Sequence, residues 1–157
     1  MRQTLTETMD VPAYRIETQR LVIRCWRPAD APLLNAAVEA SLDHLSPWMP
    51  WARGEQDDVE ARVQRLRQWR AYFDRDEDYF YGIWNPAEDA VLGATGLHTR
   101  RGPGAREIGY WIHVDHINRG LATEGRRRPA HPLTPEPGDR SPGLCEPFSW
   151  SRMSASW

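Results

Sequence analysis

The chain has 157 residues, 40% of them hydrophobic and 27% charged, with a formal net charge of −2 at pH 7. These values are typical of one folded globular domain, and the eight tryptophans argue against a disordered chain. All twenty basic residues are arginine, which we attribute to a GC-rich coding sequence, and the slightly acidic balance does not indicate a nucleic-acid-binding protein.

The first elements along the chain are predicted to be a strand and a helix. β-Branched and aromatic residues alternate over residues 19–26 and predict a strand. Asp30 is placed to cap the following helix, and Pro32 falls in its first turn, where proline is tolerated. Apolar residues then recur at helical spacing as far as Leu42.

An aromatic segment at residues 46–53 follows this helix. Its prolines, Pro47 and Pro50, lie between Trp48, Met49 and Trp51. The segment has too many prolines for a helix and too many aromatic side chains for an ordinary loop. A second helix is predicted to start at Asp57 and Asp58 and to carry an apolar stripe as far as Phe73, with its arginine-rich opposite face in solvent.

Three consecutive strands are predicted over residues 79–84, 91–98 and 107–114. Turns rich in Asn, Pro and Gly separate them at residues 85–89 and 100–105, so the strands should form an antiparallel meander. After residues 115–118, the sequence from Arg119 to Glu124 favours the start of a helix.

The character of the sequence changes after Glu124. Residues 125–157 contain six of the thirteen prolines and show no helical or strand period, and Pro129 would stop a helix that begins at Gly120 after about two turns. The sequence therefore predicts a domain over residues 17–124 and an irregular tail over residues 125–157 that is not part of the fold.

Gly120 is the first residue that suggests a ligand-binding site. A glycine between a strand and a helix, followed by small residues, lets successive backbone amides point at a phosphate group. Taken alone, such a glycine more often marks an ordinary turn.

The context of this turn resembles the GNAT acyltransferases, and among them the RimJ/RimL-like ribosomal-protein N-terminal acetyltransferases. The resemblance covers residues 17–124 and rests on four segments in order: residues 18–24, 45–51, 107–112 and 119–124. It implies an α/β (α+β) protein with a mixed sheet and the GNAT acyl-CoA N-acyltransferase fold, incomplete at its C-terminal end. The family's phosphate motif is matched at Gly120 and Ala122, whereas its first position falls on Ile117 instead of Gln or Arg.

The same resemblance implies the site residues. Glu107 matches the position of a base that acts through water on the acceptor amine. The substrate-binding residues implied are Trp48, Met49 and Trp51. The residues implied to bind acetyl-CoA are Ile112, His113 and Val114 beside the pantetheine arm, and Arg119, Gly120, Leu121, Ala122 and Thr123 at the pyrophosphate.

Other interpretations of these residues remain open. Glu107 is equally well explained as a surface carboxylate paired with Arg101 or Arg106. The aromatic segment could simply cover the core. His113 and His116 have the spacing of a metal pair on a helix, but they flank a strand end, where residues three apart face different ways, so no metal is expected.

The reaction implied is direct transfer of an acetyl group from acetyl-CoA to a primary amine, either a protein N-terminus or a small molecule. The alternative is an inactive GNAT remnant that binds a partner through an open sheet edge. Residues from about Gly125 are hypothesised to be a frameshifted or unrelated ending, because the family pattern stops in mid-helix. Two distant cysteines and no apolar stretch of membrane length lead us to expect a cytoplasmic protein without membrane or nucleic-acid partners. The oligomeric state stays open.

Overall fold

The computed structural model describes residues 12–54, 56–99 and 107–125. Its strands form one sheet in the order β1-β2-β3-β4-β5, and every pairing is antiparallel. The strands are β1 (Arg15–Glu17), β2 (Val22–Cys25), β3 (Asp78–Trp84), β4 (Val91–His98) and β5 (Glu107–Ile112). The helices are α1 (Ala31–Leu45), α2 (Val59–Asp74) and α3 (Leu121–Gly125), with short 3₁₀ turns at Pro28–Asp30, Pro50–Arg53 and Val114–His116.

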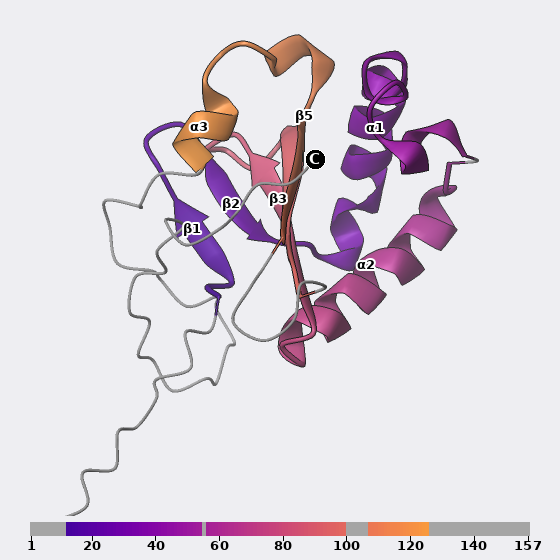
Figure 1. Cartoon of the computed structure of the whole chain (residues 1–157). Helices are drawn as coiled ribbons and strands as arrows, with labels where there is room; N and C mark the ends of the chain where they lie inside the picture. Colours follow the sequence, from indigo (N-terminus) through magenta and orange to yellow (C-terminus); the bar gives the residue numbers. More distant parts are fainter. Residues whose placement is uncertain (1–11, 55, 100–106, 126–157) are drawn as a thin grey trace, which may run out of the picture.

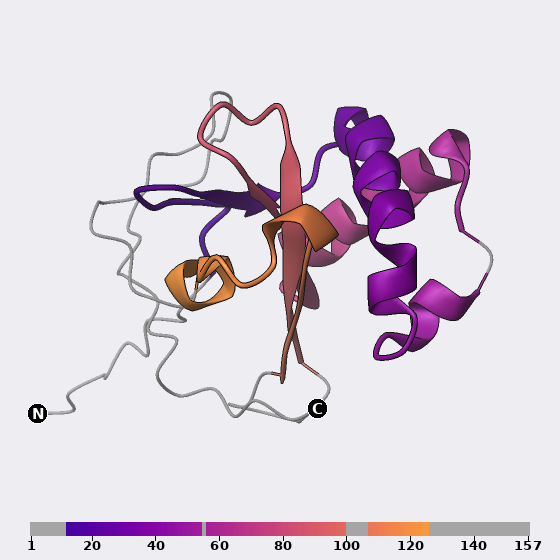
Figure 2. The same ribbon diagram turned by 90° about the horizontal axis from the view of Figure 1, so that it is seen from above.

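The sheet lies between two unequal layers. Helices α1 and α2 pack against one face, and α3 lies on the other (Figures 1 and 2). The core on the first face is centred on Trp26, Trp84 and Leu66. The core on the second face is centred on Ile23, Tyr81 and Leu97, and Leu121 of α3 belongs to it. The α/β class predicted from the sequence is confirmed.

The first predicted strand is shorter than expected, and an additional strand precedes it. Residues 18–21 form a turn in which the Thr18 amide donates to the Leu21 carbonyl at 2.8 Å and the Leu21 amide donates to the Thr18 hydroxyl at 3.1 Å. This turn joins β1 to β2, so the strand begins at Val22 rather than at residue 19. With three residues, β1 is too short for its side-chain alternation to be recognised.

Asp30 occupies the position before α1, but its side chain makes no capping hydrogen bond to that helix. Its carboxylate instead binds the guanidinium of Arg24 at 2.8 and 3.0 Å and accepts from the Arg27 amide at 2.8 Å. The prediction of an Asp30 cap was therefore wrong, because a buried arginine on β2 competes for the same oxygens.

Helix α2 starts where the sequence predicts, but one arginine expected in solvent is buried. Asp58 caps the helix by accepting from the Ala61 amide at 2.8 Å. Arg62, however, is buried, and it donates through Nε to Asn35 on α1 at 2.6 Å. The prediction that the arginine-rich face of this helix lies in solvent was therefore wrong for Arg62, since α1 packs over that part of α2.

The predicted meander is confirmed as β3, β4 and β5. Gly93 in β4 has φ of 157°, and a Cβ atom there would lie 2.2 Å from the carbonyl oxygen of Trp111 in β5. Only glycine allows these two backbones to approach so closely. The pairing of β4 with β5 thus depends on a residue whose role cannot be recognised from side-chain periodicity.

Candidate functional site

The candidate site begins at the outer edge of β5, which carries no further strand among the described residues. The His113 amide donates to the Leu92 carbonyl at 2.9 Å. Hydrogen bonds of an antiparallel pair fall on alternate residues, so Trp111 directs its backbone groups toward β4, and Tyr110 and Ile112 direct theirs away. The backbone of Ile112 is therefore oriented to pair with an extended ligand.

Of the three residues expected beside the pantetheine arm, two already use their amides within the fold. His113 binds Leu92, and the Val114 amide donates to the Ser41 hydroxyl of α1 at 3.2 Å. Strand β5 therefore ends at Ile112, two residues earlier than predicted, and Val114–His116 forms a 3₁₀ turn. Ile112 is the residue of this set whose amide faces the open edge.

The turn that follows contains two residues in the left-handed region of backbone conformation. Asn118 and Gly120 have positive φ values of 59° and 73°, and the Glu124 amide donates to the Gly120 carbonyl at 3.0 Å as α3 begins. The first amides of a helix have no carbonyl partner within the helix, so those of Leu121, Ala122 and Thr123 are directed out of its N-terminal end. Arg119 is exposed beside them.

This turn is held in place by the β1–β2 turn, a contact that the sequence did not reveal. The Glu124 carboxylate accepts from the Thr18 hydroxyl at 2.6 Å, from the Arg20 amide at 3.0 Å and from Arg20 Nε at 2.6 Å. Arg20 Nη1 also donates to the Arg119 carbonyl at 3.2 Å. Burial would raise the pKa of Glu124, but these hydrogen bonds outweigh it and the pKa is lowered.

Glu107, the expected base, begins β5 and is directly opposite His98 of β4. Side chains alternate between the faces of a strand, so Glu107 lies on the same face as Trp111, which packs with the core beneath α1 and α2. Its side chain is half-buried. Arg101 and Arg106, its alternative partners, lie outside the described residues.

One of the expected substrate-binding residues, Trp51, lies beside this face of β5. Trp51 contacts Trp111, with ring centroids 6.3 Å apart, which joins the aromatic segment to the strand. Trp51 is 45% exposed and Trp48 is 77% exposed, while Met49 is half-buried. The segment therefore leaves large aromatic surface open to solvent, whereas residues that only cover a core bury theirs.

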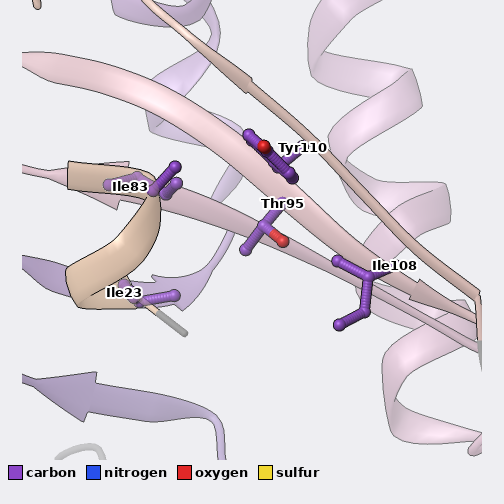
Figure 3. A pocket seen from close by; sticks show the side chains of 7 residues that line it. Ile23, Ile83, Thr95, Ile108 and Tyr110 are labelled. Atoms are coloured by element: carbon purple, nitrogen blue, oxygen red, sulfur yellow. The ribbon is translucent and has the colours of Figure 1, made fainter. Parts of the chain in front are cut away.

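A small apolar pocket lies on the opposite face, between the sheet and α3 (Figure 3). Its volume is about 300 Å³, including the part open to solvent. Its lining residues are Ile23, Ile83, Thr95, Ile108, Tyr110, Ala122 and Gly125. The pocket thus brings residues of β5 and the start of α3 to one place.

The prediction that the side chains of His113 and His116 face different ways was wrong. The two rings are in contact, with centroids 5.6 Å apart, because residues three apart eclipse one another in a 3₁₀ turn. The pKa of His116 is lowered by burial, with smaller contributions from Arg119 and His113. Among the described residues, no group of three or more His, Cys, Asp or Glu side chains could hold a metal ion.

The family model for the acetyltransferase (GNAT) domain matches residues 20–131 of the chain. The chain belongs to the GNAT family. The match includes the turn at Gly120 and all the predicted site residues, and it extends past Glu124 into residues outside the described part of the structure. Nothing in it tests the predicted boundary between domain and tail, so that boundary stays a prediction.

Among curated proteins, a GNAT relative is Probable N-acetyltransferase YjcK of Bacillus subtilis, 28% identical over 71 residues. This similarity covers 44% of the chain and 39% of the relative. The chain thus spans about two-fifths of the length of that relative. The activity and substrates of a complete enzyme are therefore proposals for this chain.

Solved GNAT structures share the fold. The ribosomal-protein-S5-alanine acetyltransferase of Vibrio fischeri superposes with a TM-score of 0.59 at 18% identity, over 69% of this chain and 60% of the other. RimL, a ribosomal L7/L12 α-N-protein acetyltransferase solved with coenzyme A, superposes with a TM-score of 0.56 at 16% identity. The superposition covers 70% of this chain and 62% of the RimL chain. These similarities confirm the GNAT fold predicted from the sequence.

The described residues contain no helix that is long and apolar enough to cross a membrane.

Proposed function

We propose that this chain transfers an acetyl group from acetyl-CoA to a primary amine by direct attack of the amine on the thioester. The observation that carries the proposal is the combination of the family match with an open strand edge leading into the turn at Gly120. The backbone of Ile112 pairs with the pantetheine arm as a further strand would. The amides of Leu121, Ala122 and Thr123 then receive the pyrophosphate.

The departure at Ile117 from the family's phosphate motif is compatible with this binding. Backbone amides provide most of the donors in such a turn, and they are present whatever side chain stands at Ile117. Arg119 and Arg20 place two guanidinium groups at the same turn, one exposed and the other 51% exposed. These charges compensate for the missing Gln or Arg of the motif.

We further propose that Glu107 prepares the acceptor. A chain-terminal amine has a pKa of about 8 and is largely protonated at neutral pH, so it must lose a proton before it can attack. Glu107 lies at the start of β5, on the face that carries Trp111, and it removes this proton through a water molecule. Trp48, Met49 and Trp51 form a wall of the acceptor site, and the exposed rings of Trp48 and Trp51 are free to contact it.

The acceptor is proposed to be a protein N-terminus. Two structural neighbours are named as acetyltransferases of ribosomal proteins, and exposed tryptophans suit a peptide better than a small polar amine.

A thiol-release assay with acetyl-CoA and peptide amines tests the activity, and calorimetric titration with acetyl-CoA tests binding separately. We expect micromolar binding and measurable release of free thiol. Folded protein that binds acetyl-CoA without turnover would instead indicate the alternative, a GNAT remnant without catalysis. Failure to bind any form of coenzyme A would contradict the proposed site altogether.

A further inference from the structure

His98 is a titratable residue that the assignments above leave without a role. It ends β4 directly opposite Glu107, and its side chain is 14% exposed. Its ring makes an edge contact with Phe80, at 5.2 Å between centroids, and Phe80 is stacked on Trp69 of α2. The imidazole therefore has a defined position on the same face of the sheet as Glu107 and Trp111.

Asp78 sets the orientation and the tautomer of this ring. Its Oδ2 lies 3.2 Å from Nδ1 of His98, and its Oδ1 accepts from the Thr99 amide at 3.0 Å. A carboxylate can only accept in this contact, so Nδ1 carries the proton and Nε2 of the neutral ring keeps its lone pair.

Two glycines leave space around that lone pair. Gly96 of β4 and Gly109 of β5 are cross-strand partners, and Nε2 would be 2.9 Å and 3.7 Å from Cβ atoms built on them. The imidazole thus lies over bare backbone, and any larger residue at Gly96 would displace it. These distances place Nε2 over the pair formed by Gly96 and Gly109, so it lies close to the middle of β5.

We propose that His98, oriented by Asp78, is a second proton acceptor of the acetyl transfer. This inference rests on the proposed function. An ammonium acceptor has to lose two protons in all to become an amide. Glu107 removes the first through water and releases it to solvent, and the neutral nitrogen then attacks the thioester carbonyl carbon.

The second proton is the one that His98 accepts. As the C–N bond forms and the C–S bond breaks, the nitrogen gives this proton to Nε2, and the thiolate of coenzyme A leaves. The imidazolium passes its proton to the thiolate and returns to the neutral form. The products are the acetylated amine, coenzyme A as free thiol and one proton in solvent.

Substitution and chemical rescue test this role. We expect His98→Ala to lower kcat about 100-fold while KM for acetyl-CoA changes by less than about twofold, because general bases contribute on that scale. Added imidazole should restore at least a tenth of the lost rate in this variant. Asp78→Asn should lower kcat about tenfold without rescue by imidazole, since it changes the tautomer of a ring that is still present.

His44, on the last turn of α1, provides the matched control. His44→Ala should leave kcat and the response to imidazole unchanged. A His98→Ala variant that is folded and as active as the parent would overturn the proposal, as would lost activity that imidazole cannot restore in any degree.

A measurement without turnover separates this proposal from the proposed function. In ¹H–¹⁵N spectra of the histidine rings, the free protein should show His98 protonated on Nδ1, and acetyl-CoA should shift its Nε2 resonance. Adenosine 3′,5′-bisphosphate, which lacks the pantetheine arm, should leave that resonance in place. If acetyl-CoA shifts the Gly120 amide but not the His98 ring, the role of His98 is wrong and the coenzyme site stands. If it shifts neither, both proposals fail.

Discussion

Arg20 binds Glu124 twice, through its backbone amide at 3.0 Å and through Nε at 2.6 Å. The two residues belong to opposite ends of the described chain, the turn between β1 and β2 and the start of α3. Because Arg20 also donates to the Arg119 carbonyl, the turn at Gly120 is fixed on the side of the sheet where α3 lies.

We therefore predict that Glu124→Gln weakens coenzyme binding. The amide keeps the size of the side chain but loses the charge on which three hydrogen bonds depend, and hydrogen bonds to charged groups contribute about 1.5–3 kcal/mol. The dissociation constant for acetyl-CoA measured by calorimetry should rise about tenfold. Glu77→Gln, in the exposed pair with Arg75, is the control and should change nothing. Equal affinities for the two variants would disprove the role of this contact.

Glu88 should make the free energy of unfolding depend on pH in the acidic range. Its hydrogen bond from Arg15 and that from Arg24 outweigh the effect of burial and lower the pKa of Glu88 to about 2. A lowered pKa gives stability that is complete above the unfolded value of 4.5 and is lost as the pH falls toward about 2. Discounted for partial exposure, this contribution is about 2 kcal/mol.

The test is urea unfolding of Glu88→Gln between pH 7 and pH 2. The variant should be about 2 kcal/mol less stable at pH 7, and the difference from the parent should shrink toward pH 2. A constant difference across this range would show that the charge of Glu88 is not what stabilises the fold.

Gly93→Ala should disrupt the pairing of β4 with β5. The new methyl group would lie 2.2 Å from the Trp111 carbonyl oxygen, and φ of 157° is unfavourable for alanine. We expect a loss of about 2–4 kcal/mol in the free energy of unfolding. Gly54→Ala is the control, because the nearest atom to its methyl group would be 3.9 Å away. A variant at Gly93 as stable as the control would contradict the close approach of the two strands.

Trp51→Ala should affect the acceptor and spare the coenzyme. Removing the ring that contacts Trp111 opens the proposed wall, so KM for a peptide amine should rise about tenfold while the affinity for acetyl-CoA stays within about twofold. Leu33→Ala removes a different exposed apolar side chain, on α1, and should leave both unchanged. If KM for the amine does not move, the aromatic segment is only a cover for the core.

Elements with a strong local signal could be predicted from the sequence. Asp58 begins α2 as expected, and the turn between β3 and β4 occurs where Asn85 and Pro86 interrupt the alternation. The turn predicted at residues 100–105 lies outside the described residues. Strand β1 and the early end of β5 could not be predicted. Both depend on contacts with distant residues, such as the Ser41 hydroxyl that binds the Val114 amide.

The residues of the candidate site also differ in whether the sequence alone could suggest them. Gly120 and Glu107 could be proposed as site residues from the sequence because they belong to contiguous motifs. His98 could not, since it lies in a strand with nothing beside it in the sequence to suggest a base, and Asp78 is 20 residues away. A His and a Glu at paired positions of two adjacent predicted strands is the signal that would have found it.

By itself, the sequence determined the order of the helices and strands from β2 onward, the family and the location of the glycine turn, because these depend on neighbours a few residues apart. Only the tertiary structure decided which charged side chains are buried, how Arg20 meets Glu124, and that the His98 ring lies over Gly96 and Gly109. The physical reason is that a hydrogen bond or a close packing contact joins residues by their distance in space, and the sequence records only their distance along the chain.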